Sequence, residues 1–120
     1  MATKEEIQSL LRHFKEKMKV WKVLFRDDRG KNAQTLADLE IRPIEREELL
    51  QKLSYADYCS GPHKESLYKG ADLWVFGKEL KKNEIYIKIS IGFVGGSVIC
   101  VSFHIAESKM KYPYKKHQSK

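Results

Sequence analysis

The sequence EIYIKISI at residues 84–91 decides the fold, because apolar and polar side chains alternate along it without a break. Successive side chains of a strand point to opposite faces of its sheet, so the alternation predicts a strand that is buried on one face only. The apolar stripe is formed by Ile85, Ile87, Ile89 and Ile91. The other face carries Tyr86, Lys88 and Ser90.

A second strand-type run, SVICVSFH, follows at residues 97–104. The glycine-containing segment at residues 92–96 between the two runs predicts a hairpin. We expect Ile99, Val101 and Phe103 to face the core, which leaves Cys100, Ser102 and His104 on the face of Tyr86.

The pairing expected from this hairpin brings ionisable groups together. With Ile91 opposite Ser97, Tyr86 faces Ser102. His104 then lies opposite Glu84 and diagonal to Tyr86, within the reach of side chains. An open sheet face that carries a phenol, an ammonium group and an imidazole is suited to phosphate chemistry.

The first half of the chain predicts helices. Thr3 and Glu6 fit a capping box, and the apolar spacing behind them predicts a helix over about residues 4–19. Asn32 is expected to cap a short helix, and Pro43 to open another that ends at about Leu53.

The second half predicts strands and turns. Residues 59–64 are expected to form a loop, and residues 73–80 a strand that turns at residues 81–83 into the Tyr86 strand. Helices followed by an antiparallel sheet predict a two-layer α+β fold. We expect one domain over residues 1–120, with a helical part at about 3–53, a sheet part at about 55–106 and a basic tail at 107–120.

Positive charge is concentrated in the second half. The chain has a formal net charge of +7, and every basic residue after position 60, histidine aside, is a lysine. Lysine is a point charge suited to attracting phosphates, so this half favours a polyanionic partner, with nucleic acid first. A solubilising surface is the alternative interpretation.

Other features limit the class of protein. The sequence has no apolar run of the roughly 20 residues needed to span a bilayer, and its N-terminus lacks the apolar segment of a signal peptide. We therefore expect a soluble, cytoplasmic protein with no membrane partner. Cys59 and Cys100 have no metal-ligand spacing around them and are expected to be reduced, structural thiols.

An ordered series of short motifs resembles the MqsR family of bacterial toxins. The motifs are Asp57-Tyr58, Leu73-Trp74, residues 84–89 and Val101-Ser102-Phe103, and the similarity is clearest over residues 54–104. Members of that family are messenger-RNA interferases of type II toxin–antitoxin systems, with a RelE-like fold. The resemblance implies a metal-independent endoribonuclease without a cofactor, which cleaves single-stranded mRNA by attack of the ribose 2′-oxygen. It also implies a cognate antitoxin protein encoded next to it.

The resemblance assigns two site residues and leaves two positions changed. Tyr86 falls on the active-site tyrosine of the family, and His104 falls where the family prototype has a catalytic lysine. A histidine titrates near neutrality and can donate a proton to a leaving alkoxide. Ser60 and Val75 fall on the positions of the other lysine and of a glutamine, and neither can replace that group. Nearby His63 and Lys64 are candidates for the missing cation.

The remaining site predictions come from position and charge. Lys88 is expected to stabilise charge on the phosphate oxygens. A turn at Lys82-Asn83 would place Glu79 opposite Tyr86, as a general base. The predicted RNA-binding residues are Lys64, Lys78, Lys82, Lys111 and Tyr112.

Each of these predictions has an alternative. Tyr86 can be a half-buried strand tyrosine, and His104 a strand-end histidine bonded to a backbone carbonyl. The tail can be a docking strap for the antitoxin or a solvated end. The changes at Ser60 and Val75 favour a non-catalytic RNA-binding or partner-binding module on the same scaffold. A small-molecule enzyme ranks last, because the glycines at residues 92–96 join two strands and do not open a helix.

Overall fold

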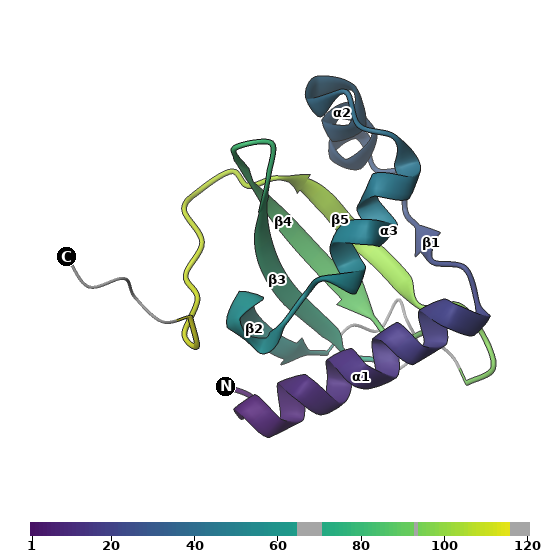
Figure 1. The fold of residues 1–120 in the computed structure, drawn as a ribbon, viewed down its shortest axis with the longest axis vertical. Coiled ribbons are helices and arrows are strands. Elements are labelled where there is room, and N and C mark those ends of the chain that lie inside the picture. The colour runs from purple at the N-terminus through teal and green to yellow at the C-terminus, as the bar shows by residue number, and fades with distance from the viewer. Residues whose placement is uncertain (65–70, 93, 116–120) are drawn as a thin grey trace.

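The computed structural model describes residues 1–64, 71–92 and 94–115. Within these residues three α-helices accompany a five-stranded sheet, so the α+β class predicted from the sequence is confirmed (Figure 1). The helices are α1 (Lys4–Val20), α2 (Gly30–Leu39) and α3 (Pro43–Gln51), followed by a short 3₁₀ helix, η1 (Tyr55–Asp57). The strands are β1 (Leu24–Phe25), β2 (Tyr58–His63), β3 (Leu73–Leu80), β4 (Asn83–Ser90) and β5 (Ile99–Ile105).

The strand order in the sheet is β1-β5-β4-β3-β2. The pairs from β2 to β5 are antiparallel, as predicted, but β1 runs parallel to β5, with Leu24 opposite Ile99. The expectation of a wholly antiparallel sheet is therefore wrong at this edge. Most of the chain separates β1 from β5, so no tight hairpin imposes an antiparallel direction on them.

The prediction of a loop at residues 59–64 is also wrong. Residues Tyr58–His63 form β2, and Ser60 lies opposite Val75 of β3. Gly61 and Pro62 suggested a turn, but a proline that donates no hydrogen bond is tolerated in an edge strand. The register of β2 shifts on both sides of Ser60, which accommodates the glycine and the proline.

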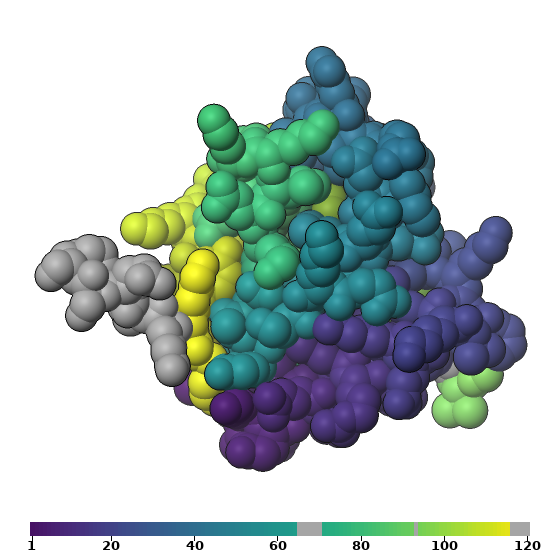
Figure 2. Space-filling view, in the orientation of Figure 1, coloured from purple at the N-terminus to yellow at the C-terminus, as the bar shows by residue number. Residues whose placement is uncertain are grey.

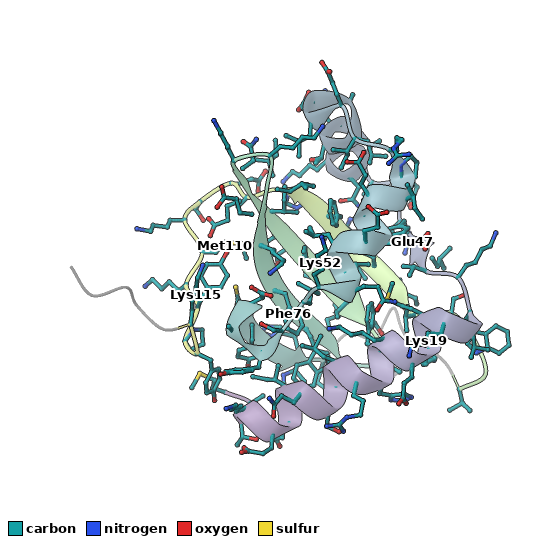
Figure 3. The ribbon with its side chains drawn as sticks, viewed as in Figure 1. Lys19, Glu47, Lys52, Phe76, Met110 and Lys115 are labelled. Atoms are coloured by element: carbon teal, nitrogen blue, oxygen red, sulfur yellow. The ribbon has the colours of Figure 1, made fainter. Side chains whose placement is uncertain are left out.

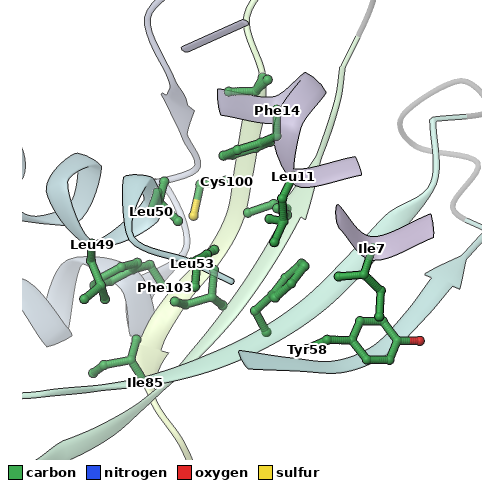
Figure 4. Close-up of a cluster of buried hydrophobic side chains, with 14 of the residues drawn as sticks. Ile7, Leu11, Phe14, Leu49, Leu50, Leu53, Tyr58, Ile85, Cys100 and Phe103 are labelled. Atoms are coloured by element: carbon green, nitrogen blue, oxygen red, sulfur yellow. The ribbon is translucent and has the colours of Figure 1, made fainter. Parts of the chain in front are cut away.

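α1 and α3 cover one face of the sheet, the face toward the viewer in Figure 1. The predicted capping box starts α1, because the Thr3 side chain accepts from the Glu6 amide and the Glu6 side chain accepts from the Thr3 amide. The core between the two layers is close-packed (Figure 4). It includes Ile7, Leu11 and Phe14 of α1, Leu49 and Leu50 of α3, and Phe76, Ile85, Ile87, Ile89 and Phe103 of the sheet.

β1 pairs with only two residues of β5, and farther along that edge polar side chains of α2 form hydrogen bonds to the backbone of β5. The Asn32 side chain donates to the Val101 carbonyl and accepts from the Phe103 amide, at 3.0 Å in both cases. The Thr35 hydroxyl accepts from the Ile105 amide at 3.2 Å. Asn32 is therefore not the cap of α2, which begins two residues earlier at Gly30. Asn32 lies inside the helix because its buried side-chain amide forms the hydrogen bonds that the open edge of β5 would otherwise lack.

Candidate active site

The face of the sheet opposite the helices carries the candidate site. Tyr86 lies directly opposite His104 on β5, and the two rings stack with centroids 5.2 Å apart and planes inclined by 15°. The predicted diagonal arrangement is thus replaced by a direct pair. The ammonium nitrogen of Lys88 lies 5.9 Å from the centre of the Tyr86 ring. The phenol, the ammonium group and the imidazole therefore do gather on one face.

A β-bulge sets this arrangement. Cys100 pairs with Ile89, whereas Ser102 pairs with Lys88, so Val101 is an extra residue between them. The register before the bulge turns Cys100 into the main core, which makes the predicted position of Cys100 wrong. The extra residue then returns Ser102 and His104 to the face of Tyr86.

The same register change moves two other side chains. Ile99 and Val101 were expected in the main core, but they form a smaller apolar cluster with Leu73 instead. Leu73 lines the groove described below, so this cluster supports the floor of the site.

A groove of about 750 Å³ lies over this face. Its floor includes a row that crosses four strands, because Ser60 is opposite Val75, Val75 is opposite Lys88, and Lys88 is opposite Ser102. Ser60 and Val75, the two positions at which the chain departs from the motifs it resembles, thus lie in the same groove as Tyr86 and His104.

The imidazole of His104 has one nitrogen held by the backbone. Its Nδ1 lies 3.0 Å from the carbonyl oxygen of Ile105, and a carbonyl oxygen only accepts, so Nδ1 carries the hydrogen. In the neutral ring Nε2 is then the nitrogen without a proton. When the ring is protonated, Nε2 becomes the donor that a leaving oxygen can use.

Positive side chains line the groove. They are Arg29, Lys64, Lys88, Lys109 and Lys111. Arg29 is the residue before the first turn of α2, and its side chain does not cap the helix. The positive end of the α2 helix dipole lies beside it and adds to the positive charge of the groove. Lys64 is partly balanced by Asp72, 3.5 Å away. Lys64, Lys88 and Lys111, which the sequence predicts to contact RNA, therefore line the same groove.

One carboxylate of the groove was missed by the sequence analysis. Glu107 lines the groove together with His104 and forms an ion pair of 2.6 Å with Lys31. The hydrogen bond and charge of Lys31, with a smaller effect of His104, lower the pKa of Glu107. Its position just past the end of β5 is the signal that could have identified it.

Glu79 does not lie where a general base was predicted. The turn after β3 is Lys81-Lys82, because Leu80 pairs with Asn83. Glu79 is therefore opposite Glu84, and Gly77 is opposite Tyr86. The predicted pairing is wrong by two residues, which keeps Glu79 on the outer face but moves it beyond the groove, to a surface that it shares with Lys82.

Lys78 points away from the groove, with Phe76 on the helical side of the sheet. Its ammonium group donates to Asp57 at 3.1 Å, and Asp57 is buried. The structure therefore separates Lys78 from Lys64 and Lys111 of the groove, and places it with Lys82 and Tyr112 around a second hollow.

Tyr112 belongs to a segment that crosses the outer face, here called the strap (residues 106–115). The Tyr112 hydroxyl donates to Glu84 at 2.6 Å, and the Met110 amide donates to the other oxygen of Glu84 at 3.2 Å. Farther on, the Tyr114 hydroxyl donates to the Ala2 carbonyl at 2.6 Å. The strap thus runs from the groove around the sheet to the N-terminus, where Figure 2 places its yellow residues against the purple ones.

The strap forms one wall of the groove through residues 106–111. Met110 and Lys115 lie along it at the margin of the sheet (Figure 3). Within residues 106–115 the predicted tail is therefore docked on its own sheet and is not a solvated end, while residues 116–120 lie outside the described part of the chain.

Three further groups of the groove bear on its chemistry. Ser60 Oγ lies 2.9 Å from Nε2 of His63, and both residues line the β2 end of the groove. Cys59 also lines the groove, but burial and the charges of Glu84 and Asp57 raise the pKa of its thiol to about 12. Cys59 is therefore a neutral thiol and no nucleophile at physiological pH.

Neither a cluster of metal ligands nor a membrane-spanning helix is present in the described residues. In residues 1–64, 71–92 and 94–115 no group of three His, Cys, Asp or Glu side chains is arranged to hold a metal ion. Over the same part of the chain no helix has the length and apolar character to cross a membrane.

No family model matches this sequence, and comparisons with curated proteins and with solved structures find no significant match. The resemblance to the MqsR family therefore remains a prediction that rests on the motifs quoted above.

Proposed function

We propose that this protein is a metal-independent endoribonuclease, a toxin of a type II toxin–antitoxin system with a RelE-like arrangement of helices and sheet. The proposal rests on one observation above the others. The stacked pair of Tyr86 and His104, with Lys88 beside it, lies in a groove lined by lysines. The order of motifs along the sequence supports the assignment to messenger RNA.

The reaction is an internal transesterification of RNA. The ribose 2′-oxygen attacks the adjacent phosphorus while the bond from phosphorus to the 5′-oxygen breaks. Protonated His104 gives the proton on Nε2 to the departing 5′-oxygen. The products are a 2′,3′-cyclic phosphate and a free 5′-hydroxyl.

The proton of the 2′-hydroxyl passes to Glu107 in this scheme. Glu107 replaces Glu79 as the base because it lines the groove beside His104, whereas Glu79 does not. Its lowered pKa keeps the carboxylate ionised over the whole physiological range, while the same shift makes it a weaker base than an ordinary glutamate. Lys88 stabilises the charge that develops on the phosphate oxygens, and the Tyr86 ring orients the phosphate.

The test is incubation of purified protein with a defined single-stranded RNA, in the presence and absence of a chelator, followed by identification of the ends. We expect cyclic phosphate and 5′-hydroxyl ends in both conditions, and no cleavage of an RNA with 2′-deoxyribose at the cut position. Glu107→Gln should slow cleavage, and Glu79→Gln should leave it unchanged. Cleavage that requires a metal, or that leaves 5′-phosphates, contradicts the proposal.

A cognate antitoxin is the second part of the proposal. The positive electrostatic field of the lysines on this face accelerates association with an acidic or amphipathic protein that covers the groove. Co-expression with the adjacent gene should give a stable complex and relieve growth arrest. Growth arrest that no neighbouring gene relieves contradicts this part.

A non-catalytic RNA-binding module is the second candidate. It is favoured by Val75, an apolar, buried side chain at the centre of the groove directly opposite Lys88. RNA that binds in the groove and stays intact would favour this candidate.

A further inference from the structure

We propose that Ser60, His63 and Lys64 form a second phosphate subsite at the β2 end of the groove, for a phosphate other than the one that is cleaved. This inference rests on the proposed function and specifies how the groove holds its substrate. It concerns the end of the groove farthest from His104 in the strand order.

The separation of the two ends is the first argument. His104 lies on β5 and Ser60 on β2, with β4 and β3 between them. Three strand spacings amount to about 14 Å between backbones. His63 also lies in the row of Leu73 and Ser90, four residues along the strands from the row of Gly77, Tyr86 and His104, which adds an offset of about 13 Å. The side chains of His63 and His104 are therefore too far apart to contact the same phosphate. They contact different phosphates of one strand.

The chemistry of the β2 end is the second argument. His63 and Lys64 are exposed at the margin of the groove, and Ser60 Oγ fixes the His63 ring through Nε2 at 2.9 Å. With the Ser60 hydroxyl donating to Nε2, the Nδ1–H group of His63 stays available, and it and the Lys64 ammonium group provide donors to the oxygens of a phosphate.

The floor between the two ends is the third argument. Val75 lines the groove between Ser60 and Lys88, Leu73 lines it opposite His63, and both are buried apolar side chains. An apolar floor between two cationic ends suits a nucleobase that lies flat between two phosphates. The groove therefore fits a single strand, with its backbone anchored on both sides of a base.

The test compares binding of uncleavable oligonucleotides that carry 2′-deoxyribose at the cut position. Wild-type protein should bind a trinucleotide or tetranucleotide more tightly than a dinucleotide with a single phosphate. His63→Ala and Lys64→Ala should each lower the affinity for the longer strands by about tenfold, with little effect on the dinucleotide. Each variant should also reduce the dependence of affinity on salt by the amount expected for one phosphate contact.

Two control variants match these changes away from the groove. His13→Ala removes an exposed histidine of α1, and Lys52→Ala removes an exposed lysine at the end of α3, labelled in Figure 3 on the helical side. Both should bind like wild type. Equal losses for short and long strands, or no loss for either in His63→Ala and Lys64→Ala, overturn the subsite.

This measurement is independent of cleavage. If natural RNA is not cleaved but the length dependence and its loss in the variants are observed, the proposed reaction fails and the subsite stands. If RNA is cleaved but the length dependence is unaffected by His63 and Lys64, the subsite fails and the reaction stands.

Discussion

Arg46 and Asp27 form an ion pair whose arginine side chain is buried. The Arg46 side chain is 4 % exposed, and its guanidinium donates to both oxygens of Asp27 and lies over the Phe25 ring. The contact joins α3 to the segment that follows β1. Removing one partner of a buried ion pair leaves the other charge unpaired, which costs more than replacing the buried charge with an apolar group.

Asp27→Ala should therefore destabilise the protein more than Arg46→Met. Asp27 is 44 % exposed, so water partly compensates the loss, and we expect about 2 kcal/mol for Asp27→Ala. Methionine can pack on Phe25 and leaves Asp27 hydrated, so Arg46→Met should cost less. Urea denaturation of both variants measures the difference, and a larger loss for Arg46→Met would refute this account of the pair.

Cys59 should be unreactive although it lines the groove. Its pKa is raised to about 12, so the thiol stays protonated below that pH and its thiolate fraction rises only as the pH approaches 12. Since an ordinary thiol has a pKa of about 8.5, alkylation of the folded protein at pH 8 should be slower than that of the unfolded chain by roughly a thousandfold. Peptide mapping after iodoacetamide treatment, with and without urea, measures this ratio. Rapid labelling of folded Cys59 would contradict it.

At the scale of elements, the β3–β4 hairpin turns through two left-handed lysines. Lys81 and Lys82 have φ angles of 50° and 67°, a conformation that costs a residue with a side chain about 1–2 kcal/mol. Lys82→Gly removes this strain but increases the entropy lost on folding, so we expect a net gain of roughly 0.5–1 kcal/mol.

Lys81→Gly is the matched control for the hairpin. The Lys81 ammonium group donates to the carbonyls of Leu39 and Glu40 at the end of α2, at 3.1 and 3.3 Å, and these bonds are lost in the variant. Its gain in chemical denaturation should therefore be smaller than that of Lys82→Gly. A destabilised Lys82→Gly protein would rule out strain at this turn.

The strap depends on a glycine of β3. A Cβ at Gly77 would overlap the Tyr112 hydroxyl and lie 2.8 Å from the Met110 sulfur. Gly77→Ala should therefore detach the strap, so hydrogen exchange of residues 107–115 should accelerate and RNA affinity should fall. Gly30→Ala, where a Cβ meets nothing within 4 Å, is the control and should preserve slow exchange in the strap. Unchanged exchange in Gly77→Ala would show that the strap is not held there.

The elements differ in how far the sequence predicts them. Alternation at residues 84–91 predicts β4 because its pattern has the period of a strand and one face is buried. The pairing of β4 with β5 was mispredicted by two residues at Tyr86: Ser90 pairs with Ile99 and not with Val98, which is a shift of one residue at the loop, and the bulged Val101 adds a second. Nothing in the sequence marks either shift. The role of Asn32 was missed because its partners on β5 are about 70 residues away along the chain.

At the scale of the whole molecule, the two faces of the sheet have different roles. The helices bury the isoleucine face of β4, and the strap covers only part of the other face. The predicted placement on the open face agrees with the structure for Tyr86 and Lys88, which alternate along β4, and for His104, which the bulge at Val101 returns to that face. The site prediction failed for Glu79, where the turn register decides the pairing, and for Glu107, which lies beyond the strand pattern.

The central claim is that His104 performs proton transfer in RNA cleavage on this open face. The most direct test is the single-turnover cleavage rate of His104→Ala on a defined RNA, with RNA affinity and folding measured on the same protein. We predict a rate lower by about 10²–10⁴-fold, with affinity and thermal unfolding close to wild type, because the contribution is made in the transition state. A folded His104→Ala protein that cleaves at the wild-type rate would contradict the claim.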